Sequence, residues 1–318
     1  TAFVICADHG HIPTGGHGGW ESDVTVVPAI FTGAGVRLNS GSIDQIDIAP
    51  TVAALLDIDI PRHAMGRVRG EILLAGEEYA EEFGSAHYSA FAEGYVATLG
   101  GTTGFSIPSS TDARAAIDAM TQEREESDRN DRLAMALALA GAALGALVVL
   151  GLGSWRAVVA AYAGTAAYYA IYNGLYFVFH GHQWSLSAFN SEDLVEAFFN
   201  LRMVEAAVAA VLGVIVAGVV YPYLRRRPKG PRQGFLGGWL ALGTATILTI
   251  QATLAFQVAW FLWRYGAEVS WRLPNLKWGF KYDLDLIQMT ALGAAVLVAP
   301  LVTYLVGRYH PRVRRATE

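Results

Sequence analysis

Five long apolar segments after residue 132 constrain what this chain can fold into. Each has about 20 residues or more, the length a helix needs to cross ~30 Å of hydrocarbon. Because so many runs crowd into one region, membrane spans are favoured over the buried helices of a soluble core. The composition agrees, with 53% hydrophobic and only 16% charged residues. We therefore predict an all-α, five-helix transmembrane domain over residues 133–318, with spans at about 133–153, 157–179, 203–224, 236–263 and 287–307.

Basic residues predict how these spans are oriented. They cluster between the third and fourth spans, in residues 225–232, and in the tail from Arg308 to Arg315. Positively charged loops stay in the cytoplasm, so both regions are expected there. Since five spans alternate, residues 1–132 are expected to be extracytoplasmic, or lumenal in a eukaryote. The small net charge of −5 and the lack of a basic patch in the soluble part exclude nucleic acid as a partner.

Residues 1–109 have the pattern of α/β structure. The apolar run Thr1–Cys6 predicts a buried strand, and residues 24–31 predict a second one, with Pro28 at an edge. Asp47 is expected to cap a helix that continues to Leu56 and packs on the sheet through Ile48, Val52 and Leu55. Residues 110–132 predict a charged connecting helix that runs into the first span without a break.

Candidate metal ligands follow the first strand. Asp8 and His9 stand at its end, and His17 lies in the loop Gly15-Gly16-His17-Gly18-Gly19. Glycines let the backbone pass close to a small charged site, and zinc accepts both Asp oxygen and His nitrogen. An alternative is a hydrogen-bonded turn, because Asp and Gly are common turn residues. The second histidine within a glycine loop favours the metal site.

An ordered set of motifs runs through the first 70 residues. The set comprises Ala7-Asp8-His9-Gly10, His17-Gly18, Gln45–Thr51 with Leu55-Leu56, Ile60-Pro61 and Gly66. It resembles the C-terminal part of the catalytic domain of the alkaline phosphatase superfamily. Within that superfamily it is most similar to the type I phosphodiesterase/nucleotide pyrophosphatase branch and to the membrane ethanolamine-phosphate transferases of glycosylphosphatidylinositol assembly. The fold implied is the C-terminal part of an alkaline-phosphatase-like α/β sheet domain.

The resemblance also implies a two-metal site. Zinc is the expected ion, with manganese as the alternative. Asp8 and His9 would bind the metal that holds the nucleophile, and His17 would bind the other. His11 is a candidate for contact with the substrate phosphate, although a surface role is equally open. Glu21 and Asp23, which follow the loop, are expected to be structural.

The family's remaining catalytic residues lie upstream of its Asp-His-Gly motif. They are a Ser or Thr nucleophile, an early Asp and an Asp-x-x-x-His pair, so we expect them before Thr1 and no catalytic nucleophile in this chain. The chain is thus interpreted as the C-terminal portion of a longer enzyme. The implied activity is hydrolysis or transfer of a phosphate (di)ester outside the cytoplasm, with a lipid-linked substrate suggested by the membrane anchor.

The main alternative belongs to another functional class. A chain without the nucleophile half could be a catalytically inactive membrane scaffold or lipid-binding protein with a degenerate phosphatase-like cap. Three ligand-type residues around one loop argue against it, because an inactive site has no need of them. A transporter has less support, since the spans show no internal repeat.

Polar residues inside the predicted spans should face other helices or a cavity, because lipid does not solvate them. They are Asn173, Glu205, Gln251 and Gln257. Glu205 lies near a span end, and the favoured interpretation is that it reaches toward the membrane surface. His180 and His182 are interpreted as interfacial polar surface rather than as a metal pair.

Overall fold

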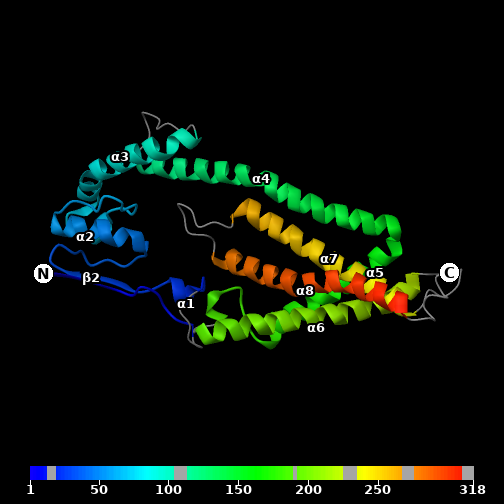
Figure 1. Ribbon diagram of the computed structural model, residues 1–318. Helices are drawn as coiled ribbons and strands as arrows, with labels where there is room; N and C mark the ends of the chain where they lie inside the picture. Colours follow the sequence, from blue (N-terminus) through cyan, green and yellow to red (C-terminus); the bar gives the residue numbers. More distant parts are fainter. Residues whose placement is uncertain (13–18, 104–112, 189–191, 225–234, 267–275, 310–318) are drawn as a thin grey trace. The chain divides into compact units, whose positions relative to one another are not determined.

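The structure, a computed structural model, describes residues 1–12, 19–103, 113–188, 192–224, 235–266 and 276–309. The chain divides into two compact units (Figure 1). The first unit comprises residues 1–10 and 26–131, and the second comprises residues 11–25 and 132–318. Each unit has a hydrophobic core of its own.

The predicted α/β sheet domain is wrong. The described residues are 75% helical and form one sheet, which has two strands. Strand β1 (Ala2–Cys6) pairs antiparallel with β2 (Ala29–Gly33). The expected second strand begins later than predicted, because its first residues form the helical turn α1 (Ser22–Thr25). The pattern of apolar residues indicates which segments can form strands. It does not indicate which strands pair, because a sheet joins strands from distant parts of the chain.

Strand β1 is also less buried than predicted. Phe3 and Ile5 are 58% and 59% exposed, while the alternate residues Ala2 and Val4 are partly covered. Successive side chains of a strand point to opposite faces, so one face of this hairpin is open within the described residues.

The core of the first unit lies around helix α2 (Ile48–Leu56), which follows the short turn η1 (Gln45–Asp47). The predicted helix is therefore confirmed, but its buried face is not the predicted one. Small residues of α2 are buried, and they pack against residues from the segments before and after the short turn η2 (Gly70–Ile72) and from α3 (Gly76–Thr103). The cluster is Ala53, Ala54, Ile60, Val68, Leu73 and Ala80.

Long helices build the second unit. Helix α4 (Ala113–Gly153) is continuous, which confirms that the charged connecting helix runs into the first apolar segment. Ser154 then caps α5 (Trp155–Asn173), which continues into a π-helical turn, η3 (Gly174–Phe179). The short turn η4 (Leu186–Ala188) precedes the last three helices, α6 (Glu192–Leu224), α7 (Phe235–Arg264) and α8 (Leu276–Tyr309).

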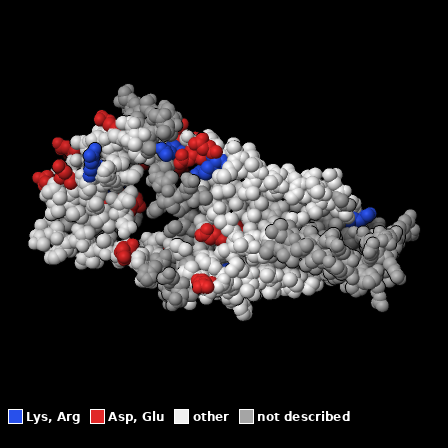
Figure 2. All heavy atoms as spheres, viewed as in Figure 1, with Lys and Arg blue, Asp and Glu red and all other residues white. Residues whose placement is uncertain are grey.

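Three helices of the described residues are long and apolar enough to cross a membrane. These segments are Asp118–Leu152 in α4, Leu194–Leu224 in α6 and Gly238–Arg264 in α7. On the face seen in Figure 2, the described part of the helical unit carries few charged side chains. The chain is accordingly treated as a membrane protein, while the number of spans and their orientation stay predictions.

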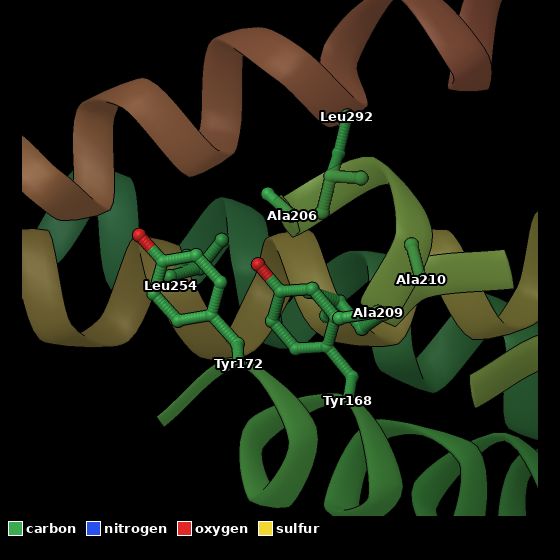
Figure 3. Close-up of a cluster of buried hydrophobic side chains, with 8 residues drawn as sticks. Tyr168, Tyr172, Ala206, Ala209, Ala210, Leu254 and Leu292 are labelled. Atoms are coloured by element: carbon green, nitrogen blue, oxygen red, sulfur yellow. The ribbon is translucent and has the colours of Figure 1, made fainter. Parts of the chain in front are cut away.

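Helix α5 packs against α6 and α7, and its Tyr168 OH donates a hydrogen bond to Gln288 Oε1 of α8. Tyr168 and Tyr172 project from α5 toward small residues of α6, among them Ala206 and Ala209 (Figure 3). Small residues let helix backbones approach closely, which is the usual basis of helix packing in membranes. These contacts bring one face of α5 beside α7 and α8, where several buried polar residues lie.

Candidate functional site

Asp8 and His9 follow β1 in the first unit. The Asp8 side chain is 87% exposed, and its Oδ1 accepts a hydrogen bond from the backbone N of His9 at 3.0 Å. His9 Nδ1 lies 2.9 Å from the carbonyl oxygen of Gly10. Because a carbonyl only accepts, Nδ1 donates this hydrogen bond, and in a neutral imidazole Nε2 then carries the lone pair. Metal-binding histidines commonly have this tautomer.

The two side chains fit a shared metal ion. His9 Nε2 lies 3.7 Å from Asp8 Oδ2. Two ligand atoms on one tetrahedral zinc, each at about 2.1 Å, are about 3.4 Å apart. The observed separation therefore needs an adjustment of only a few tenths of an ångström. Among the residues that the structure describes, no group of three His, Cys, Asp or Glu side chains is gathered for a metal.

The other predicted site residues are placed less fully. His17 lies outside the described residues, so its predicted role as a metal ligand stays a prediction. His11 is described and is exposed. Its suggested contact with a substrate phosphate also stays a prediction.

Trp20 and Glu21 follow the loop that holds His17. Both contact other residues of the second unit. Trp20 Nε1 donates a hydrogen bond to the carbonyl oxygen of Trp184 at 2.5 Å, and the ammonium of Lys277 lies 4.3 Å from the centre of the Trp20 ring. Ser185 Oγ donates to Glu21 Oε2 at 2.9 Å. These contacts agree with the predicted structural role of Glu21.

Asp47 has a different role from the predicted helix cap. Its side chain makes no capping hydrogen bond to α2. Instead Oδ1 accepts from the backbone N of Arg67 at 2.9 Å, and Oδ2 accepts from Arg69 Nη1 at 3.1 Å. Thr51 Oγ1 accepts from the backbone N of Arg69 at 3.1 Å. Two motif residues therefore hold the segment 67–69 against α2.

Gly66 shows the same structural role for the motif. A Cβ atom at this position would lie 1.9 Å from the carbonyl oxygen of Ile46, so only glycine lets the two backbones approach this closely. Asp47, Thr51 and Gly66 thus shape the fold of the first unit, rather than supplying chemistry.

Glu205 is buried among polar partners, so the prediction that it reaches toward the membrane surface is wrong. Its Oε1 lies 2.7 Å from His180 Nε2, and its Oε2 lies 2.8 Å from Arg202 Nη1. Arg202 is fully buried, and its guanidinium also stacks over the ring of Phe198. A charged group in lipid is costly, and these partners offset part of that cost.

His180 and His182 are therefore not simple interfacial surface. Their rings stack at 5.3 Å, and His182 packs edge-on against Phe198. Burial lowers the pKa of His182, and the positive charge of Arg202 acts in the same direction. Neither histidine belongs to a three-residue metal group among the described side chains.

The remaining predicted polar residues face other helices or a cavity, as expected. Gln251 Nε2 donates to the carbonyl oxygen of Met289, and Asn173 lines a cavity. Gln257 Nε2 donates to Tyr169 OH at 2.9 Å, and Lys281 Nζ donates to Gln257 Oε1 at 2.9 Å. Lys281 also pairs with Asp285.

Sequence reasoning missed two cations of the helical unit, the buried Arg202 and the partly buried Lys281. A signal was present, because each has a carboxylate three or four residues later on the same helix face. Lys281 and Asp285 precede an apolar run. A charged pair in that position is usually interpreted as the exposed polar end of a helix, so its place at a cavity was not predicted.

Comparison with known proteins finds a similarity over part of the chain. The chain is 31% identical over 100 residues to the human protein "GPI ethanolamine phosphate transferase 3, catalytic subunit". The match covers 29% of this chain and 9% of that protein, so the chain corresponds to less than a tenth of the relative's length. No protein-family model and no solved structure matches the chain.

Proposed function

We propose that this chain belongs to a membrane-anchored, metal-dependent enzyme that transfers or hydrolyses a phosphate ester outside the cytoplasm. The observation that carries the proposal is the pairing of Asp8 Oδ2 with His9 Nε2 at 3.7 Å, immediately after a strand. The similarity to an ethanolamine phosphate transferase and the three membrane-type helices support it.

The proposed ligands are Asp8, His9 and His17. Asp8 supplies a carboxylate oxygen, His9 supplies Nε2, and the bond from His9 Nδ1 to Gly10 holds the imidazole in the tautomer that can bind. Two divalent ions, zinc first and manganese as the alternative, would activate a hydroxyl nucleophile and stabilise the oxygens of an in-line displacement.

The acceptor decides between the two reaction types. Attack by water on a phosphorylated Ser or Thr completes a hydrolysis, whereas attack by an acceptor hydroxyl completes a transfer. The similarity favours transfer, and the membrane helices favour a substrate carried by a lipid.

Metal analysis of the protein purified from its native membrane tests the proposal. We expect bound zinc or manganese in the wild type and its loss in Asp8→Asn and His17→Ala. His63→Ala is a matched control, because His63 is an exposed histidine of the first unit. Turnover of a phosphodiester should fall with the metal content, by about a hundredfold or more, because the metals lower the nucleophile pKa.

The same experiment distinguishes the proposed enzyme from the catalytically inactive alternative. A folded wild-type protein that holds no metal and turns over no phosphate ester would contradict the proposal. It would favour the membrane scaffold or lipid-binding protein.

A further inference from the structure

A cavity of about 320 Å³ lies between α5, η3, α7 and α8 in the second unit. Tyr172 and Tyr176 line it on the side of α5 and η3, and Gln257, Lys281 and Gln288 line it on the side of α7 and α8. One wall is the π-helical turn η3, a distortion that often marks a functional position in a helix. The site predicted from the sequence includes none of these residues.

The cavity wall offers hydrogen-bond donors that lack acceptors. Tyr172 is buried, and its hydroxyl has no hydrogen-bond partner among the described residues. The ammonium of Lys281 has three N–H groups, of which Gln257 and Asp285 accept two. A buried polar group without a partner is unfavourable, so its presence beside a cavity points to a missing acceptor.

Arg202 adds further donors behind this wall. Its guanidinium lies over the ring of Tyr176, 5.6 Å from the ring centre. It forms a close ion pair with Glu205, yet none of its three nitrogens has a well-aligned hydrogen bond to a described residue. The two cations, Arg202 and Lys281, are each matched by one carboxylate, Glu205 and Asp285. Positive and negative charges around the cavity are therefore balanced, whereas hydrogen-bond donors exceed their acceptors.

We propose that this cavity binds a phosphate group. A phosphate presents several oxygens that accept hydrogen bonds, which suits the hydroxyl of Tyr172 and the ammonium of Lys281. Aromatic walls and the neighbouring membrane-type helix α7 suit the head group of a phospholipid, and free inorganic phosphate shares the same chemistry. The proposal is independent of the metal site, so the two can fail separately.

Tyr172→Phe is the decisive variant, because it removes only the unpartnered hydroxyl. Without ligand, its thermal stability should equal that of the wild type. Tyr162→Phe is the matched control, since Tyr162 lies on the same helix and is 45% exposed. A double variant, Lys281→Met with Asp285→Asn, removes the second donor without leaving a buried charge.

Binding is measured on the whole protein in an uncharged detergent with EDTA present, which removes any contribution from metals. The probes are dihexanoyl phosphatidic acid, dihexanoylglycerol with the same chains but no phosphate, and inorganic phosphate. Ligand-induced thermal stabilisation reports occupancy, and a change in the total tryptophan fluorescence supports it, since Trp184 lines the cavity.

We expect phosphatidic acid to bind and dihexanoylglycerol not to bind. Tyr172→Phe should weaken binding about tenfold, as loss of a hydrogen bond to a charged group does, and Tyr162→Phe should not. The double variant should weaken binding at least as much. If inorganic phosphate alone binds with the same dependence on Tyr172, the site is confirmed and free phosphate is its source. Equal binding of dihexanoylglycerol, or an unchanged affinity in Tyr172→Phe, would overturn the proposal.

Discussion

Asp47 and Arg69 form a buried ion pair that holds the first unit together. The Asp47 side chain is only 3% exposed, and that of Arg69 is 13% exposed. Asp47 is also the acceptor for the backbone of Arg67, so one carboxylate fixes two points of the segment that follows α2. Without Asp47, the backbone N of Arg67 would lose its acceptor, and Arg69 would keep Glu71 as its carboxylate partner among the described residues.

Asp47→Ala should therefore destabilise the first unit strongly. We expect the free energy of unfolding to fall by about 2 kcal/mol, because a partly buried backbone N–H loses its acceptor and one of the two ion pairs of Arg69 is lost. Hydrogen exchange of the α2 amides measures this directly. Asp44→Ala is the control, because Asp44 is exposed and its side chain caps nothing. Similar exchange rates in the two variants would contradict the assigned role of Asp47.

Glu71 predicts a pH dependence of the same region. Burial opposes its ionisation, but hydrogen bonds and the positive charge from Arg69 outweigh burial and lower the pKa of Glu71. Because the folded pKa lies below the unfolded one, the stabilisation is present above the unfolded value, about 4.3, and is lost as the pH falls through the folded pKa.

Glu71→Gln should remove this acid-dependent loss. The wild type should lose protection of η2 and α2 amides as the pH falls from about 5 to about 3, the range that brackets the unfolded value. The variant should start less stable and change less over the same range. Parallel pH profiles for the two proteins would show that Glu71 does not contribute.

Helices α5 and α6 cross at two glycines. A Cβ on Gly164 would lie 2.5 Å from the carbonyl oxygen of Gly213, and a Cβ on Gly213 would lie 2.6 Å from that of Gly164. Each glycine thus lets the other helix approach, and this crossing brings Tyr168 and Tyr172 onto the alanines of α6.

Gly164→Ala should push the two helices apart. We expect a loss of about 1–3 kcal/mol, typical of an overfilled contact, seen as a lower melting temperature in detergent. Gly141→Ala on α4 serves as the control, because a Cβ there has no neighbour within 4 Å. The control should be neutral or slightly more stable, since alanine favours helix over glycine. Equal melting temperatures of the wild type and Gly164→Ala would disprove the close crossing of α5 and α6.

For the whole molecule, the predicted orientation in the membrane is testable with the one cysteine of the sequence. Cys6 is exposed in the first unit, which is predicted to be extracytoplasmic. It should react with a membrane-impermeant maleimide on intact cells or sealed, right-side-out vesicles. In a Cys6→Ala variant that also carries Lys229→Cys, labelling should require permeabilisation. The reverse pattern would invert the proposed topology.

Helical elements were the most predictable part of the chain. The apolar segments of α4, α6 and α7 are each long enough to cross a membrane, a property that length and composition alone reveal. Helix α2 was predicted correctly for a similar reason, because its hydrogen bonds form between residues four apart. The strand at residues 29–33 was placed only approximately, and the larger sheet was predicted wrongly, since strand pairing joins distant segments.

The sequence by itself determined the membrane-type helices and the adjacent Asp8 and His9, because apolar length and neighbouring residues are local properties. Only the tertiary structure decided that Asp47 binds Arg69, that Glu205 is buried with Arg202, and that Tyr172 faces a cavity. Those contacts join residues on different helices or loops, or depend on which helix face is covered. Packing in three dimensions, rather than the order of residues along the chain, brings their donors and acceptors together.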